Sequence, residues 1–226
     1  KNNNIFEIMH SVGVISKLIP QFSRIVCQAQ FDQYHLFTVD QHTIKALNTL
    51  KKIDYGEETE NKYLFASSIL ERIKNKKPLY LATLFHDIGK GYECNHNVIG
   101  SKIAKSVCEK FDLSVDEIDD ITWLVANHQK FCDLAFKSDL EDREIIKNLS
   151  LSIKKPEILM ALFVLTVIDI SSVNEGILTE WKLSLIVKLY KKCEEEMFSS
   201  NQKIHKKNLV ELQQQKSFES TVVTSY

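Results

Sequence analysis

The chain has 226 residues, a formal net charge of −1, and 44% apolar and 26% charged residues, which is ordinary for a globular domain. This balance gives no support for nucleic acid or a membrane surface as a partner. Six glycines and three prolines favour long helices over turn-rich β structure. Five cysteines without a C-x-x-C pair argue against disulfides or a zinc ribbon, and they predict reduced thiols in a cytoplasmic protein.

Helical spacing of apolar residues dominates the first half of the chain. Thr38 and Gln41 have the spacing of a capping box at the start of one helix, and Pro78 is suited to open another. The helix that follows Pro78 is apolar on nearly every side, so we expect it in the core, ended by Gly89 and Gly91. The predicted helices are 5–19, ended by Pro20, then 39–53, 60–73 and 79–87.

The second half of the chain continues in the same way, and no strand, repeat or internal linker is predicted. Ser114 and Glu117 form a second candidate capping box, and Pro156 opens a second all-apolar helix. The predicted helices are 97–111, 114–127, 141–149, 157–170 and 175–198, the last with Trp181, Leu185, Leu189 and Tyr190 as its inner face. The sequence after Ser199 is polar and predicts a loose tail. The expected architecture is an all-α bundle without a membrane span.

Polar residues at the ends of the two apolar helices are candidates for chemistry. His86 and Asp87 follow one, and Asp169 lies near the end of the other. An unpaired carboxylate there would cost several kcal/mol, so each needs a partner. For Asp169 alone a helix cap or a salt bridge is the simpler explanation, and His42 alone reads as a satisfied core histidine. Together their nitrogen and oxygen donors would suit Mn, Fe, Zn or Mg.

Two further histidines, His96 and His128, stand near predicted helix ends. The complete set in chain order is His42, His86-Asp87, His96, His128 and Asp169. This order resembles that of the HD superfamily of metal-dependent phosphohydrolases. The stretch Leu-Phe-His-Asp-Ile-Gly-Lys at 84–90 is similar to the central motif of that superfamily. The resemblance implies an HD-domain helical bundle.

The stretch Tyr-His-Leu-Phe-Thr-Val-Asp-Gln-His-Thr at 34–43 is more specific. With residues 95–101, 123–128 and 165–170, it resembles the uridylyl-removing domain of the bifunctional PII uridylyltransferase family, over roughly 12–190. The loop between Lys90 and His96 looks shortened, with Asn95 where that family usually has Asp. The family's nucleotidyltransferase and amino-acid-sensing domains are not recognisable. We therefore expect an isolated module of a larger protein, with a lead-in at 1–30, the HD domain at 31–200 and a tail at 201–226.

The resemblance implies a metal-dependent phosphodiesterase that removes UMP from the uridylylated PII nitrogen-signalling protein. Its expected partners are that substrate and the other domains of a parent enzyme. The expected cofactor is one or two divalent ions, Mn or Mg first, with Fe or Zn as alternatives. The implied metal ligands are His42, His86, Asp87 and Asp169, with Asp87, His96 and His128 for a second metal. The implied catalytic residues are Asp87, Lys90, His96 and His128.

Three alternatives stay open. The chain would also fit an HD hydrolase of a free nucleotide, such as guanosine tetraphosphate or a deoxynucleoside triphosphate. It would fit a non-catalytic regulatory module that a metal stabilises. RNA binding is a weaker alternative, because no basic stripe with aromatic residues is present. Lys90 would either stabilise a phosphate or lie in solvent at a helix end. Asp40 and Asn127 are candidates to fix histidine tautomers from the second layer around a metal.

Overall fold

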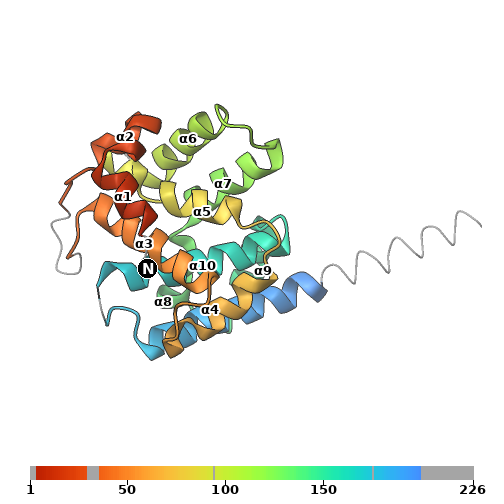
Figure 1. Ribbon diagram of the computed structural model, residues 1–226. Coiled ribbons are helices and arrows are strands. Elements are labelled where there is room, and N and C mark those ends of the chain that lie inside the picture. Colours follow the sequence, from red (N-terminus) through yellow and green to blue (C-terminus); the bar gives the residue numbers. More distant parts are fainter. Residues whose placement is uncertain (1–3, 30–35, 94, 175, 200–226) are drawn as a thin grey trace, which may run out of the picture.

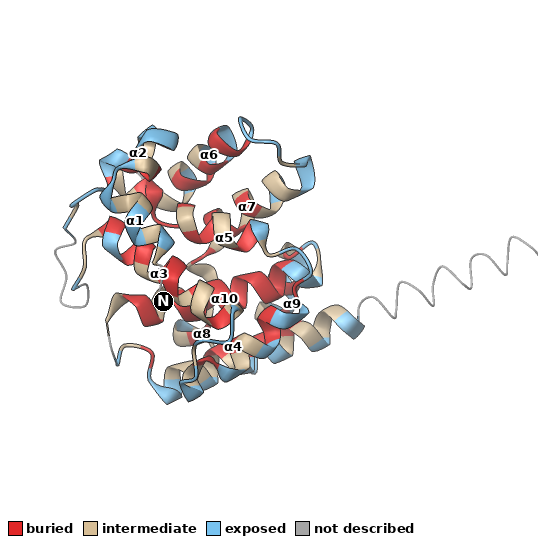
Figure 2. Cartoon of the chain, in the orientation of Figure 1, coloured by how far each residue is buried: buried red, intermediate tan, exposed pale blue. Residues whose placement is uncertain are grey.

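A computed structural model describes residues 4–29, 36–93, 95–174 and 176–199, and within these ranges the regular structure is entirely helical (Figure 1). The predicted all-α class is therefore confirmed. The apolar helix α10 (Pro156–Val173) lies at the centre, and Figure 2 shows it buried along most of its length. Its neighbours are α3 (Val39–Asp54), α4 (Asn61–Arg72), α5 (Lys77–Phe85), α7 (Val115–Asn127) and α8 (Lys130–Lys137).

Helix α10 is also the one described helix that is long and apolar enough to cross a membrane by composition alone. However, 72% of its 18-residue window is buried inside the fold. Leu162, Phe163, Val164 and Leu165 are all fully buried against other helices. Burial of such side chains is the dominant favourable contribution to folding, so α10 acts here as the core helix of the bundle.

The predicted helix at 5–19 is wrong, because the structure divides it into α1 (Ile5–Ser11) and α2 (Val14–Leu18). Gly13 separates them with φ at +76°, a backbone conformation that residues with a Cβ rarely adopt. Residues 20–24 then form the 3₁₀ turn η1 (Pro20–Arg24) instead of simply ending the helix. Phe22 and Ile25 are fully buried, so this segment is anchored to the core.

The two predicted capping boxes have opposite outcomes. The hydroxyl of Ser114 accepts the Glu117 N–H, and the Glu117 carboxylate accepts the Ser114 N–H, so this box opens α7 as predicted. Thr38 does stand before α3, but it makes no side-chain capping bond. Its hydroxyl donates to the buried Asp40 carboxylate instead, so that part of the prediction is wrong.

The remaining helices largely follow the pattern, and the main differences lie in the second half of the chain. Helix α9 (Arg143–Ser152) begins after the predicted residue 141, and α8 was not predicted at all. The last described helix spans 180–199, so it begins later than expected, and Glu175 and the tail after Ser199 lie outside the described residues. Leu189 and Tyr190 are buried there and Leu185 is half-buried, but Trp181 is 65% exposed and does not belong to the inner face.

The turn after α5 is packed tightly against its neighbours. Residues 88–91 form the 3₁₀ turn η2 (Ile88–Gly91), followed by α6 (His96–Cys108). A Cβ on Gly89 would lie 2.0 Å from the His96 carbonyl oxygen and 2.8 Å from the Gly100 nitrogen. Only glycine allows this approach, and it brings the start of α6 directly onto the turn that follows His86 and Asp87.

Candidate metal centre

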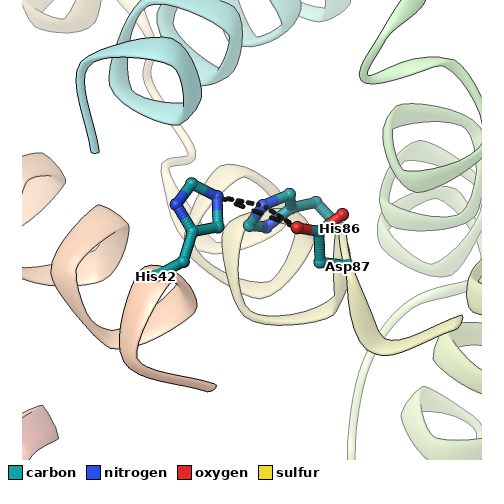
Figure 3. Close-up of side chains that lie close together, drawn as sticks. All are labelled: His42, His86 and Asp87. Carbon is teal, nitrogen blue, oxygen red and sulfur yellow. Dashed lines mark hydrogen bonds and ion pairs between the residues drawn. The ribbon is translucent and has the colours of Figure 1, made fainter. Parts of the chain in front are cut away.

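Three helices bring four of the predicted ligands together. His42 comes from the first turn of α3, His86 and Asp87 from the end of α5, and Asp169 from α10. Figure 3 shows the His42 ring pointing toward His86 and Asp87. The side chains of His42, His86 and Asp87 are each no more than 3% exposed, whereas that of Asp169 is 19% exposed.

The distances between the donor atoms suit a shared cation. His42 Nε2 lies 3.1 Å from His86 Nε2, 2.9 Å from Asp169 Oδ1 and 3.8 Å from Asp87 Oδ2. His86 Nε2 lies 3.4 Å from Asp87 Oδ2 and 3.6 Å from Asp169 Oδ1. Ligands about 2.1 Å from one ion are separated by roughly 3.0 to 3.4 Å in octahedral or tetrahedral arrangements, so the observed spacing fits.

Hydrogen bonds alone do not explain this crowding. A single nitrogen, His42 Nε2, contacts both an imidazole nitrogen and a carboxylate oxygen. If His42 Nε2 carries the proton, it can donate to Asp169 but cannot accept from His86. If it lacks the proton, it can accept from His86 but cannot donate to Asp169. A cation at the centre would instead accept lone pairs from all of these atoms. The donor set is therefore one that could hold a divalent metal.

The ends of α5 and α7 fix the tautomers of two histidines. His86 Nδ1 lies 2.8 Å from the Thr83 carbonyl oxygen, and His128 Nδ1 lies 2.8 Å from the Val125 carbonyl oxygen. A carbonyl only accepts, so each Nδ1 must donate, and each Nε2 is directed inward. Both histidines stand at a helix C-terminus, where the helix dipole favours a cation.

A second group of donors adjoins the first and shares Asp87. It consists of Asp87, His96 and His128, whose donor atoms lie within 4.8 Å of one another. Asp87 Oδ2 faces His42 and His86, whereas Asp87 Oδ1 lies 3.7 Å from His128 Nε2. Among the described residues, the buried Nε2 atoms of His96 and His128 have no hydrogen-bond partner. Such buried polar atoms call for a ligand, so this group could hold a second ion beside the first.

The surroundings shift the pKa values of the carboxylates and of two histidines in the site. Burial would raise the pKa of Asp87, but His86 and then Lys90 hold it well below its usual value. Burial would likewise raise the pKa of Asp169, and His42 and His86 hold it low. For His96 and His128, burial lowers the pKa, so both rings are neutral near pH 7. Ionised carboxylates and neutral imidazoles are the forms that coordinate metals.

Without a bound cation, His86 carries the compensating charge, and this predicts a pH dependence of stability. Burial lowers its pKa, but Asp87 and Asp169 outweigh burial and raise it from 6.5 to about 10. Because the folded pKa exceeds the unfolded one, this stabilisation is complete below pH 6.5 and is lost as the pH rises through about 10. In chelator, the free energy of unfolding from urea titrations should fall more steeply over this range for wild type than for His86→Gln. Equal slopes would contradict the charge assignment.

The other predicted site residues also have definite positions. Lys90 lies one turn after Asp87, and its Nζ is 2.7 Å from Asp87 Oδ2, so it faces the donor atoms. Asp40 pairs with His10 at 3.0 Å and with Thr38, and the Asn127 amide donates to the Trp123 carbonyl. Asp40 and Asn127 therefore do not fix the tautomers of His86 and His128, and the Thr83 and Val125 carbonyls do so instead. The sequence signal for this is a histidine directly after the last residue of a helix, where its Nδ1 reaches the carbonyl three residues earlier.

Comparison with known proteins places this geometry in a family. The HD domain family matches residues 39–162, more than half of the chain. The matched range includes His42, His86, Asp87, His96 and His128, whereas Asp169 lies beyond it and joins the group only through the fold. The chain belongs to the HD domain family of phosphohydrolases, as the sequence predicted.

Relatives within this family share a more particular name, bifunctional uridylyltransferase/uridylyl-removing enzyme. The chain is 39% identical to the protein of Azospirillum brasilense and 40% identical to that of Zymomonas mobilis, each over 189 residues. It is 34% identical to that of Erythrobacter litoralis over 202 residues. These alignments cover 84%, 84% and 89% of this chain but only 20%, 20% and 22% of the relatives. The chain thus spans about a fifth of their length, and the predicted resemblance to this family is confirmed.

Proposed function

We propose that this chain is the uridylyl-removing hydrolase region of such an enzyme and releases UMP from a uridylylated tyrosine of PII. The observation that carries the proposal is that Asp87 belongs to both donor groups. The relatives that are named for this activity align with 80–89% of the chain. The predicted partners are uridylylated PII and other domains of the parent protein, and the predicted location is the cytoplasm.

His42, His86, Asp87 and Asp169 would hold the first divalent ion, with Mn or Mg as the first choice. Asp87, His96 and His128 would hold a second ion, if two bind. When bound, such ions lower the pKa of water and neutralise charge on a phosphate. The protein's own contribution is to keep His96 and His128 neutral and the carboxylates ionised, and to direct the donor atoms into a site that is buried except beside Asp169 and Lys90.

Lys90 is the cation nearest to these donors, at 2.7 Å from Asp87 Oδ2. In the proposed reaction its ammonium turns toward a phosphate oxygen of the substrate and stabilises the negative charge there. His96 Nε2 and His128 Nε2 are neutral and inward, so each can take a proton from water if it does not bind a metal. A tyrosine phenolate with an unperturbed pKa of about 10 leaves without strong acid assistance.

The test is a direct comparison of substrates. The purified chain is incubated with Mn(II) and uridylylated PII, guanosine tetraphosphate or deoxynucleoside triphosphates, and products are separated by chromatography. We expect UMP release from PII at a rate well above hydrolysis of either free nucleotide. Preference for a free nucleotide would support the first alternative, and no turnover of any substrate with metal bound would support a non-catalytic module.

A further inference from the structure

We propose that Gln28 is a positioning residue, which sets the turn carrying Lys90 relative to the helix carrying His42. Gln28 lies in the N-terminal lead-in, before the range that the HD family matches. The inference rests on the proposed hydrolase function, in which Lys90 contacts the substrate phosphate.

Gln28 connects two elements of the site through two different groups. Its main-chain carbonyl accepts the N–H of Val39, the first residue of α3, at 3.0 Å. Its side-chain Nε2 donates to the Lys90 carbonyl at 2.7 Å. His42 lies in the first turn of the same helix, and Lys90 belongs to η2 immediately after Asp87. One residue therefore links α3, which carries His42, to the turn that directly follows Asp87 and carries Lys90.

The lead-in supports Gln28 with further contacts to the same turn. The Arg24 guanidinium lies 4.5 Å from the centre of the Tyr92 ring, and a Cβ on Gly91 would meet Arg24 Cβ at 2.7 Å. On the other side, Gly89 lies against the start of α6. The turn is thus enclosed between the lead-in and α6, and a side-chain hydrogen bond from Gln28 in the lead-in reaches the Lys90 main chain.

The position of the Lys90 main chain determines where its ammonium acts. The Lys90 N–H donates to the Asp87 carbonyl at 2.9 Å, and Nζ returns to Asp87 Oδ2 at 2.7 Å. Loss of the bond to Gln28 would let this one-turn loop shift without removing any donor atom of the two groups. Misplacement of a catalytic group by about 1 Å can cost about 100-fold in rate.

Two substitutions test this role. Gln28→Glu keeps the size of the side chain but removes the N–H donor, and Gln28→Met removes it without adding charge. The exposed Asn61, the first residue of α4, provides the matched control Asn61→Asp. We expect both Gln28 variants, in chelator, to exchange amide hydrogens in residues 88–92 up to about tenfold faster than wild type, as the loss of one hydrogen bond predicts.

With Mn(II) and bis(4-nitrophenyl) phosphate, both Gln28 variants should lose about 10- to 100-fold in kcat/KM. In a Lys90→Ala background the same substitutions should cause little further loss, because Gln28 acts through Lys90. A full additional loss there, unchanged exchange at 88–92, or faster exchange with wild-type kcat/KM would each overturn the proposal. If wild type lacks phosphodiesterase activity, the proposed function fails, and the exchange measurement alone decides whether Gln28 holds the turn.

Discussion

Replacement of Asp87 by alanine should lower kcat/KM for bis(4-nitrophenyl) phosphate with Mn(II) by at least about 10³-fold, since several kcal/mol of charge stabilisation depend on this site. Asp87 is the carboxylate that both donor groups share. Its Oδ2 faces His42, His86 and Lys90, and its Oδ1 faces His128. One substitution therefore disrupts both candidate metal positions and removes the partner of Lys90.

The control for this experiment is Asp54→Asn. Asp54 is also a carboxylate between α3 and α5, paired with Lys76 and with the Tyr80 hydroxyl at 2.9 Å, but it contacts none of the site residues in those interactions. We expect it to retain activity within about twofold, as is usual for substitutions away from the site. Far-UV circular dichroism of Asp87→Ala and of the isosteric Asp87→Asn would show that both are folded. A folded Asp87 variant with a wild-type rate would refute the assignment of the site.

The candidate ligands could be named from the sequence because they combine a specific motif with core helices of clear apolar pattern. An all-apolar helix such as α10 is expected in the core of the bundle. A polar residue near its end, Asp169, then needs a polar or charged partner inside the bundle. The sequence could not say which partner it finds. The fold answers this by placing Asp169 Oδ1 2.9 Å from His42 Nε2. Periodicity fixes which residues are inside, but not which helices adjoin.

Three errors of the sequence prediction have separate physical causes. The sequence predicts Trp181 on the inner face of its helix, yet it lies five residues before the buried Ile186, a rotation of about 140° away from the buried stripe. Helix α8 has only eight residues, too few for periodicity to stand out from a loop. Thr38 and Ser114 have the same capping spacing, but a buried Asp40 competes for the Thr38 hydroxyl. A capping pattern is therefore overruled where a nearby side chain, here two residues further along the chain, offers the hydroxyl another acceptor.

Addition of a divalent metal should raise the melting temperature of the chain by a large amount. A ligand that binds only the folded state at 100 times its Kd adds about 2.7 kcal/mol of stability. For a domain of this size each kcal/mol corresponds to about 2–4 °C, so we expect Tm to rise by roughly 5–10 °C on addition of Mn(II) after chelator treatment. The physical reason is that a cation would bind several crowded donor atoms at once, among them His42 Nε2, which lies 2.9 Å from Asp169 Oδ1 and 3.1 Å from His86 Nε2.

Variants of single ligands would separate the two donor groups. His42→Gln removes a donor from the first group alone, and His128→Gln removes one from the second alone. If one ion binds, in the first group, His42→Gln should abolish the Tm shift and His128→Gln should leave it almost intact, with one Mn(II) per chain by calorimetric titration. If two ions bind, wild type should take up two and each variant should keep part of the shift. Because Asp87 contributes to both groups, Asp87→Asn should abolish the shift in either case, and a full shift in that variant would place the metal elsewhere.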